Sequence, residues 1–442
     1  MNWNDKNEVL KRVEIDSWDL KYASNELKND KDVVLTAVKQ NWGALKDASD
    51  ELKNDKEVVM TAVKQNGDAL YFASDELKND REVVMTAVKQ NGWCLMYASD
   101  KLKADRDIVI TAVKNFGDAL HYASNELKKN KEVVMTAVKK DGNSLQYASD
   151  ELKNDKDVVM EAVKQNWEAL YYASDELKKD RELGMDTIKK SAWALEYVSD
   201  EFRADKEIVL GAVKQNGNVL QYASNELKND KEVVLTAVKN SGEALKFASE
   251  ELKNDKEIVM EALKNYKLAL KYASEGLKAD REIVLEAIKK DAWSALKYAS
   301  DELKADREVV REAVKQDGWA LEFASDELKN NKDIVLEALK QNAYSLQFAS
   351  DELQKDKEFI KEAINTNIEV FYILEDINKE LQKDPEIIET TINKLKEYEY
   401  SKSVDLESLK QYPEELKGIL ETINFKKEDL VKDNENKIQF GE

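Results

Sequence analysis

Apolar and polar positions follow a pattern that repeats every 25 residues from residue 5 to about residue 365. Residues 51–75 read ELKNDKEVVMTAVKQNGDALYFASD, and near-copies lie on both sides at the same spacing. One leucine of the pattern marks fourteen copies, with a one-residue slip after the eleventh, at Leu20, Leu45, Leu70, Leu95, Leu120, Leu145, Leu170, Leu195, Leu220, Leu245, Leu270, Leu296, Leu321 and Leu346. A fixed period of this length indicates a stacked repeat architecture.

The first half of the repeat predicts an α-helix over Asp55–Gln65. Asp55 is the expected N-cap, because its carboxylate accepts hydrogen bonds from free backbone N–H groups of the first turn. Asn54 is the alternative cap, but in other copies an alanine stands before the aspartate, which favours the aspartate. The buried face is expected to hold Val58, Val59, Met60, Ala62 and Val63. Gly67, or Asn66 before it, is expected to end the helix in the left-handed conformation.

The second half predicts another helix over Asp68–Lys78, with an apolar stripe of its own. The stripe consists of Ala69, Leu70, Ala73 and Leu77. A helix of about ten residues is marginal alone, so neighbouring copies must stabilise it. The sequence therefore predicts an all-α fold, an α-solenoid (superhelix) of about fourteen 25-residue helical hairpin repeats. A coiled coil does not fit, because turn signals recur twice in every repeat and no heptad continues through them.

Two interior places depart from the pattern. In the copy at 180–199, Gly184 replaces a valine and Val198 replaces an alanine. This layer is therefore expected to be the softest of the array and a candidate bend. The one-residue slip lies near Ala292–Ala295 and is expected to change the curvature locally.

The two ends of the array also differ from its middle. Glu8 and Arg12 replace apolar or small residues in the first copy, as a solvent-facing terminal layer requires. After about residue 365 the repeat decays, which predicts a repeat array over 1–365 and a divergent helical capping segment with a polar tail over 366–442. Asp384 followed by proline resembles an N-cap and first helical position, so one hairpin is expected over 368–397. Two more short helices are expected within 405–424.

Composition narrows the classes of partner and compartment. The net charge is −21, and such a surface repels phosphate backbones and anionic membranes, so neither nucleic acid nor membrane is an expected partner. No apolar stretch approaches the roughly 20 residues of a membrane span, and the sequence MNWNDKNEVL at the start lacks signal-peptide features. A cytoplasmic or other intracellular location is expected, and secretion by a route without an N-terminal signal peptide stays open.

The residue types of common active sites are scarce, so no catalytic, cofactor or metal site is expected. His121 is the only histidine and stands where other copies have Tyr71, Met96 or Gln146, which favours variation at a surface position. Cys94 stands where neighbouring copies have alanine; it is interpreted as a small core residue, with a redox-sensitive thiol as the alternative. Acidic clusters lack the ligand spacing of a calcium loop, and helix capping explains them.

Tryptophan is the residue type that breaks the repeat most clearly. Four tryptophans share one repeat position: Trp18, Trp93, Trp193 and Trp319. Polar residues occupy this position in other copies, so the side chains are expected to be at least partly exposed. Packing over the corner of the hairpin is the favoured interpretation. The alternative is that these four side chains bind a partner, because tryptophan is enriched at binding hot spots.

The recurring string ALxYASDELKNDKEVVLTAVKQNG closely resembles the family of domains of unknown function numbered 4116. Nearly every copy between residues 17 and 365 fits, although Val219 replaces an alanine and Asp47 replaces the aromatic residue. The family unit resembles two of these 25-residue blocks. The resemblance implies a helical repeat and implies no activity, because the family has none assigned.

Three functional hypotheses follow. The leading one is a non-enzymatic helical-repeat scaffold that binds a protein partner, of unknown identity, through an elongated acidic surface. The alternative is a structural protein whose copies associate with one another into a larger body or filament. The third is a module of an enzymatic or effector system, with the activity in residues 366–442.

Overall fold

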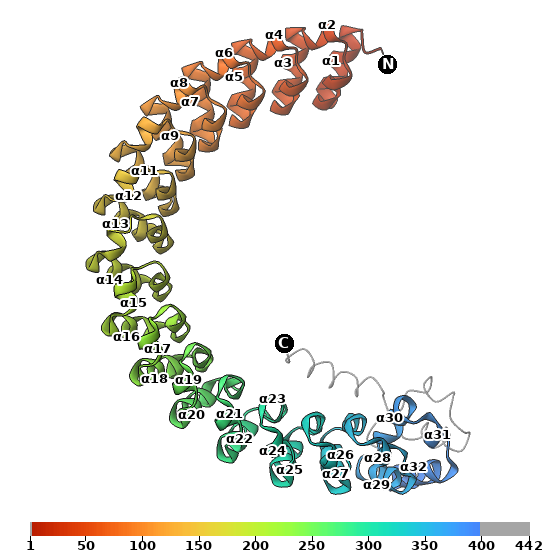
Figure 1. Cartoon of the computed structure of the whole chain (residues 1–442). Coiled ribbons are helices and arrows are strands. Elements are labelled where there is room, and N and C mark those ends of the chain that lie inside the picture. The colour runs from red at the N-terminus through yellow and green to blue at the C-terminus, as the bar shows by residue number, and fades with distance from the viewer. Residues whose placement is uncertain (1, 398–442) are drawn as a thin grey trace. The chain divides into compact units, whose positions relative to one another are not determined.

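The computed structural model describes residues 2–397, which form helices joined by turns and short extended segments (Figure 1). The chain forms two compact units, Met1–Leu227 and Lys228–Glu442, called the N-terminal and C-terminal units below. Within each unit, helical layers of about 25 residues lie side by side, which confirms the predicted all-α solenoid. The predicted division into 1–365 and 366–442 stays a prediction.

Each layer begins with a long α-helix. In the N-terminal unit these helices are α1 (Lys6–Ile15), α3 (Lys31–Gln40), α5 (Lys56–Gln65), α7 (Arg81–Gln90), α9 (Arg106–Asn115), α11 (Lys131–Lys140), α13 (Lys156–Gln165), α14 (Arg181–Lys190) and α16 (Lys206–Gln215). In the C-terminal unit they are α18 (Lys231–Asn240), α20 (Lys256–Asn265), α22 (Arg281–Ile288), α25 (Arg307–Gln316), α27 (Lys332–Gln341), α29 (Lys357–Thr366) and α32 (Pro385–Glu397).

A second arm follows the long helix and forms a 3₁₀ helix in most layers. In the N-terminal unit the arms hold η1 (Ser17–Tyr22), η2 (Trp42–Asp47), η3 (Gly67–Phe72), η4 (Gly92–Tyr97), η5 (Gly117–Tyr122), η6 (Gly142–Tyr147), η7 (Trp167–Tyr172), η9 (Ala192–Glu196) and η10 (Gly217–Tyr222). In the C-terminal unit they hold η11 (Gly242–Phe247), η12 (Ala269–Tyr272), α23 (Ala292–Tyr298), η13 (Gly318–Phe323), η14 (Ala343–Phe348) and α30 (Val370–Ile377).

A short helix ends each layer that is followed by another. These helices are α2 (Asn25–Lys28), α4 (Asp50–Lys53), α6 (Asp75–Lys78), α8 (Asp100–Lys103), α10 (Asn125–Lys128), α12 (Asp150–Lys153), η8 (Leu177–Lys179), α15 (Asp200–Arg203), α17 (Asn225–Lys228), α19 (Glu250–Lys253), α21 (Glu275–Lys278), α24 (Asp301–Lys304), α26 (Asp326–Lys329), α28 (Asp351–Lys355) and α31 (Lys379–Gln382). Near the N-terminus in Figure 1, long helices such as α1, α3 and α5 form one row and the short helices form a second.

The long helix forms as the sequence predicts. The Asp55 carboxylate accepts hydrogen bonds from the backbone N–H groups of Glu57 and Val58, at 2.9 and 3.1 Å, so the aspartate is the cap. The core positions Val58, Val59, Ala62 and Val63 are fully buried, whereas Met60 is only half-buried. The core therefore lies between long helices and arms of successive layers, and each layer completes the burial of its neighbour.

The predicted continuous helix over Asp68–Lys78 is wrong. The 3₁₀ helix η3 ends at Phe72, Ala73 is extended with φ −66° and ψ 155°, and α6 begins only after Ser74. The break places the Ser74 backbone N–H where it donates to the Lys53 carbonyl of the preceding layer at 2.9 Å. The Ser74 hydroxyl oxygen also accepts from the Leu77 N–H at 3.2 Å and caps α6. The extended segment thus joins adjacent layers through the backbone.

Gly67 has a steric role, and the predicted left-handed helix end is wrong. Asn66 is extended, with φ −150° and ψ 123°, and its side chain caps η3. Gly67 does not have a positive φ in the left-handed range; a Cβ there would lie 2.7 Å from the Ala87 carbonyl oxygen of the next layer. At Gly92 the same atom would lie 2.2 Å from the Ala112 oxygen. Glycine therefore permits close stacking of layers.

An ion-pair ladder connects the N-terminal ends of successive long helices. In the N-terminal unit, Lys31 Nζ lies 2.8 Å from both the Asp55 cap and Glu57 of the next layer. Partial burial alone would raise the pKa of Asp55, but hydrogen bonds from Lys31 and from backbone N–H groups together lower it. Lys231 in the C-terminal unit repeats the arrangement with Asp255, at 2.7 Å. Each partly exposed pair contributes little, but the pairs fix the register between layers.

A second polar connection, the asparagine bridge, joins the short helices of adjacent layers. The Asn154 side-chain amide donates to Glu176 at 2.8 Å, and its carbonyl oxygen accepts from the Ser174 hydroxyl at 2.5 Å. The same bridge links Asn54 with Ser74 and Glu76. Its asparagine is absent from several layers, including those with Lys129 and Lys179 in this position.

The layer at 180–199 is repacked, and its predicted softness and bend stay predictions. Gly184 removes a side chain, and the ring of Phe202 fills the space, so a Cβ at Gly184 would lie 2.8 Å from that ring. Phe202 stands where other layers have leucine, and Val198 adds volume beside it. Thr187 is fully buried, and its hydroxyl donates to the Leu183 carbonyl at 2.7 Å. Phe202 and Val198 thus fill the volume that is lost at Gly184.

The one-residue slip is absorbed by a change of helix type. In a regular arm the Ala69 N–H donates to the Asn66 carbonyl, three residues earlier. In the arm with the extra residue, the Ala295 N–H donates to the Asp291 carbonyl, four residues earlier, and α23 is an α-helix. The added residue therefore lengthens the hydrogen-bonded turn while Leu296 stays fully buried.

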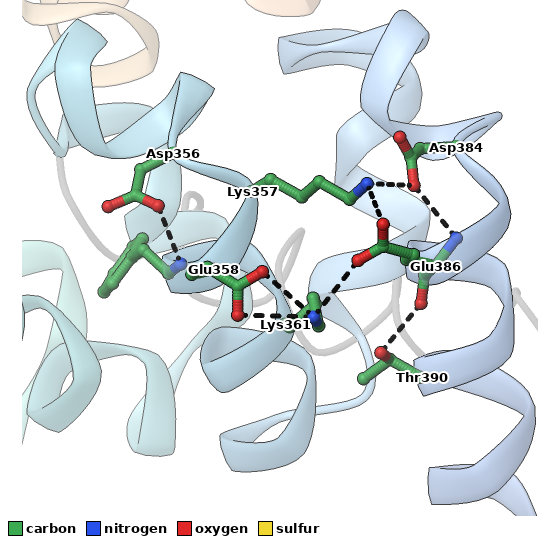
Figure 2. A network of polar contacts seen from close by, with 8 residues as sticks. Asp356, Lys357, Glu358, Lys361, Asp384, Glu386 and Thr390 are labelled. Atoms are coloured by element: carbon green, nitrogen blue, oxygen red, sulfur yellow. Dashed lines mark hydrogen bonds and ion pairs between the residues drawn. The ribbon is translucent and has the colours of Figure 1, made fainter.

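The ladder continues beyond residue 365 to α32, and Figure 2 shows its last described ion pairs. Lys357 Nζ lies 3.1 Å from Asp384 and 2.7 Å from Glu386, and Lys361 also pairs with Glu386 at 3.4 Å. The Asp384 carboxylate accepts from the Glu386 N–H at 2.9 Å, so the predicted cap is confirmed. Pro385 occupies the repeat position of the ladder cation. Proline has no charged side chain, so it cannot form an ion pair with a following layer.

The helices predicted within 405–424 and the predicted polar tail lie outside the described residues. At the other end, Glu8 and Arg12 are exposed, as predicted for a terminal layer. In the part of the chain that the structure describes, none of the helices combines the length and the apolar character needed to cross a membrane.

Candidate interaction surface

The second arms of the N-terminal unit carry one aromatic ring each at a fixed position in nearly every layer. This ring position comprises Tyr22, Phe72, Tyr97, Tyr122, Tyr147, Tyr172, Tyr197 and Tyr222, with Asp47 as the exception. The extended alanine that follows aims the arm's last residue away from the core, so the rings are half-buried or exposed. The ring position and the residue before it are called the aromatic edge below.

The irregular tryptophans pack against this edge. Trp93 lies 5.4 Å from the Tyr122 ring of the next layer, and Trp193 lies 6.1 Å from Tyr222, both edge to face. Such pairs add stability beyond the area they bury. Trp18 meets the exceptional layer that lacks a ring, and lies instead against Gly43, where a Cβ would come within 2.7 Å of its ring. These contacts agree with the favoured interpretation, in which the tryptophans pack over the corner of the hairpin.

Packing leaves three of the four predicted tryptophans substantially exposed. Trp18, Trp93 and Trp193 keep 47, 41 and 36 % of their surface accessible. Trp319, in the C-terminal unit, is half-buried and lies 5.5 Å from the Phe348 ring. The structure places the first three at equivalent positions within one unit. Their predicted role in binding a partner stays a prediction.

Two tyrosines that the sequence reasoning did not select are more exposed than any tryptophan. Tyr71 and Tyr171 are 57 and 59 % exposed and stand directly before the ring position. Their rings contact Tyr97 and Tyr197 of the next layers at 5.3 and 5.5 Å. His121 occupies the same position and lies 4.8 Å from Tyr147. The placement of this position on the surface, inferred from His121, could have identified both tyrosines.

In three arms of the C-terminal unit a lysine lies over the rings of the corresponding edge, whereas Glu322 and Gln347 occupy that position in the next two arms. Lys246 lies over the Phe247 ring at 4.8 Å, and Lys271 lies over Tyr272 at 5.4 Å. Lys297 covers both Trp293 and Tyr298, at 4.6 and 5.8 Å. A lysine stem shields a ring while its ammonium group stays hydrated. In the N-terminal unit Lys21 lies over the Tyr22 ring in the same way, at 4.6 Å, and Lys178 lies 5.7 Å from the Tyr171 ring. The units therefore differ at particular layers, above all where Tyr71 and Tyr171 stand in one and Lys246 and Lys271 in the other.

The remaining candidates for chemistry have structural roles. Cys94 is fully buried, as predicted, and its thiol contacts an Asp68 carboxylate oxygen at 3.3 Å. Burial, together with this contact, raises the pKa of the Cys94 thiol to about 12, so the reactive thiolate is disfavoured at neutral pH. His121 is exposed, as predicted. Within residues 2–397, no group of three or more His, Cys, Asp or Glu side chains is arranged to hold a metal ion.

Comparison with protein families gives matches along most of the chain. The model of the family described as domain of unknown function (DUF4116) matches residues 5–53, 32–78, 55–103, 80–128, 105–153, 130–178, 155–203, 180–228, 205–253, 230–278, 280–329, 306–354 and 331–373. The chain belongs to the DUF4116 family. A comparison with curated proteins gave no match.

The DUF4116 matches agree with the stacking of layers. Most start about 25 residues after the one before and cover close to two repeats. A unit of two blocks therefore contains one complete junction between layers, including one rung of the ion-pair ladder. The last match ends at residue 373, within α30, so α32 lies beyond it although it continues the ladder.

Proposed function

We propose that this chain is a non-enzymatic scaffold whose N-terminal unit binds a protein partner along its aromatic edge. The observation that carries the proposal is the set of exposed large apolar side chains among the described residues. These are Ile15, Trp18, Tyr22, Tyr71, Trp93, Tyr171 and Trp193. Six of the seven lie on the second arms, and all seven belong to the N-terminal unit.

The chemistry of these side chains suits protein recognition. Tyrosine and tryptophan bring large, rigid contact areas and lose little conformational entropy on binding. Exposed rings touch rings of the next layer in pairs, as Tyr71 does with Tyr97 and Tyr171 with Tyr197, so they gather in clusters and are not scattered single residues. Connected exposed apolar surface is a common mark of an interaction site.

The short helices beside the edge supply its proposed acidic character. Asp75 and Asp100 have fully exposed side chains, whereas Lys78 and Lys103 on the same helices are only 24 % exposed. The lysine stems pack against the layer, and the carboxylates stand in solvent. We therefore expect the partner's contacting surface to carry arginine or lysine, because arginine both pairs with carboxylates and stacks on aromatic rings.

Site-specific photo-crosslinking tests the proposal. A benzophenone amino acid is placed at the position of Tyr71 or Tyr171 in the full-length chain, which is expressed in its native cell and irradiated. Lys246 and Lys271 provide matched controls, because they occupy the same repeat position in the C-terminal unit. Mass spectrometry is expected to identify one and the same protein at Tyr71 and Tyr171. No product, or an equal yield at the control positions, would show that the edge is not the binding surface.

The alternative of end-to-end assembly has less support from the last described layer. Pro385 replaces the ladder cation at α32. A layer of a second copy packed directly on α32 would therefore lack the cation that connects adjacent layers elsewhere. Light scattering is expected to give the mass of a monomer across concentration, and a mass that rises with concentration would favour self-association instead.

A further inference from the structure

The exposed rings of the N-terminal unit form the same kind of cluster at two places. In the first cluster the exposed Tyr71 ring lies 5.3 Å from the Tyr97 ring of the next arm. The exposed Trp93, which stands on the same arm as Tyr97, lies 5.4 Å from the Tyr122 ring of the arm after that. The first cluster therefore spans three successive arms, η3, η4 and η5.

The second cluster repeats these contacts four layers later, on η7, η9 and η10. The Tyr171 ring lies 5.5 Å from that of Tyr197, and Trp193 lies 6.1 Å from Tyr222. The angles between the ring planes agree as well. They are 61 and 67° for the two tyrosine pairs, and 77 and 75° for the two pairs of tryptophan and tyrosine.

The likeness of the two clusters does not follow from identical layers. Among the fourteen copies of the repeat, only these two places combine a tyrosine before the ring position with a tryptophan near the start of the next arm. The core below them differs, since Gly184 and Phe202 of the second cluster correspond to Val84 and Leu102 of the first. The same ring contacts are thus present above two different cores.

Spacing and direction limit what can bind both clusters at once. Four layers at about 8–10 Å each place the clusters about 32–40 Å apart. Figure 1 shows the layers of the N-terminal unit stacked in chain order, and the tyrosine arm precedes the tryptophan arm in both clusters, so both point the same way. A two-fold axis between two copies of a partner would reverse that direction. Tandem copies of one motif within a single chain keep it.

Charge at the rims of the clusters indicates the chemistry of the motif. The side chains of Asp75 and Asp175 are fully exposed at equivalent positions, whereas the lysines on the same short helices are only 24 and 23 % exposed. Arginine complements such a surface, because it pairs with carboxylates and stacks on aromatic rings. The rim of the second cluster is the more acidic one, since Glu201 corresponds to Lys101 of the first.

We propose that the N-terminal unit binds two tandem copies of one arginine-bearing motif of a single partner chain, one copy at each cluster. The proposal rests on the proposed function and adds the organisation of the partner to it. The linker between the copies needs at least about ten residues, because an extended chain advances about 3.3–3.6 Å per residue over a span of about 32–40 Å. Two linked copies bind more tightly than one, because the second copy binds intramolecularly.

Photo-crosslinking from two positions of one full-length chain tests the proposal in the native cell. The benzophenone amino acid replaces both Tyr71 and Tyr171. The expected product joins one partner chain to one scaffold chain. Mass spectrometry is expected to find two stretches of the partner that share a motif and lie at least about ten residues apart. Replacement of Tyr71 and Lys271 is the matched control, and only one crosslinked stretch is expected there.

The outcomes separate this proposal from the proposed function. Two partner chains on one scaffold chain, one shared stretch at both positions, or two stretches without a common motif would overturn the tandem arrangement. Each of these results would leave the aromatic edge as a binding surface. No product at either position would overturn the proposed function, and this proposal with it.

Titration calorimetry counts the sites with a synthetic peptide of the stretch crosslinked at Tyr71. This single-copy peptide is expected to bind the full-length wild-type chain with a stoichiometry of two, and to bind Tyr71→Lys or Tyr171→Lys with a stoichiometry of one. A tandem peptide with the natural linker is expected to bind about 100-fold more tightly, and to lose that gain in either variant. A stoichiometry of one on the wild type, or a tandem peptide that binds no more tightly, would overturn the proposal.

Added salt tests the charge of the motif at each cluster. Tyr71→Lys leaves only the second cluster, and Tyr171→Lys leaves only the first. Because the second rim is more acidic, binding of the single-copy peptide is expected to weaken more steeply with salt in Tyr71→Lys. The reverse order would overturn the assignment of an arginine-bearing motif.

Discussion

The aromatic edges of the two units differ although their backbones are built from the same layers. In the N-terminal unit Tyr71 and Tyr171 stand exposed before the ring position, whereas in the C-terminal unit Lys246 and Lys271 stand there and lie over the rings. Both units share the caps, the backbone bond from the extended serine, and the ion-pair ladder. The comparison teaches that the repeat fixes the scaffold, while one variable position changes which side chains the edge presents.

Replacement of the stacking glycines is expected to have the largest effect, and the same effect in both units. A Cβ at Gly92 would lie 2.2 Å from the Ala112 oxygen, and one at Gly242 would lie 2.4 Å from the Ala262 oxygen. Because backbone atoms must move, Gly92→Ala and Gly242→Ala are each expected to lower the free energy of unfolding by about 3 kcal/mol. Chemical denaturation measures this.

Gly211→Ala is the matched control for the glycine variants, because nothing lies within 4 Å of a Cβ there. It lies inside α16 and is expected to raise the free energy of unfolding by about 0.5–1 kcal/mol, as alanine favours helix. A destabilising Gly211→Ala, or harmless Gly92→Ala and Gly242→Ala, would contradict the steric account of close stacking.

A double-mutant cycle at the repacked layer is expected to show the next largest effect. Gly184→Val alone forces a side chain against the Phe202 ring and is expected to cost about 2 kcal/mol. Phe202→Leu alone leaves a void and is expected to cost about 1 kcal/mol. The double variant recreates the ordinary pair and is expected to be close to wild type in unfolding free energy. Simple additivity of the two losses would show that the substitutions do not compensate one another.

The ion-pair ladder is expected to give smaller losses that are equal in the two units and depend on pH. Partial burial would raise the pKa of Asp80, but Lys56 and backbone N–H groups lower it, and Lys256 lowers the pKa of Asp280. Since folding depresses these pKa values, the stabilisation is present above the unfolded value near about 3.9 and is lost as pH falls through the folded values.

Lys56→Met and Lys256→Met are accordingly expected to lower the free energy of unfolding slightly, and by similar amounts, at pH 7. Near pH 3 these losses should be smaller, because below the unfolded pKa the unfolded chain takes up protons that the paired aspartates of the folded wild type bind only at lower pH. Thermal unfolding at both pH values measures the difference. Asn130 and Asn331 are natural caps without a charge, so Asp80→Asn serves as a control that keeps the cap and removes the ion pair. Losses independent of pH would refute the electrostatic origin.

The sequence predicted the parts of the fold that depend on which residue types recur at fixed positions within one repeat. The period, the Asp55 cap and the buried valines followed from residues within one repeat. The break in the second arm did not follow from the residues of one repeat, because the extended Ala73–Ser74 segment is stabilised by a hydrogen bond to Lys53 of another layer. The role of Gly67 was missed for the same reason: its constraint comes from the Ala87 carbonyl of the next layer.

The candidate surface was predicted in part. Trp18, Trp93 and Trp193 were selected because they break the pattern, and they are exposed. Tyr71 and Tyr171 do not stand out in the sequence, because tyrosine is also common at the adjacent ring position.

The affinity of the crosslinked partner tests the central claim most directly. Its dissociation constant is measured for the wild-type chain, for Tyr71→Lys with Tyr171→Lys, and for Lys246→Tyr with Lys271→Tyr. The first double variant gives the N-terminal unit the lysine cover of the C-terminal unit, and is expected to weaken binding about 100-fold at an unchanged melting temperature. The second should leave affinity within about twofold, because it changes the other edge. Wild-type affinity in the first variant would contradict the account.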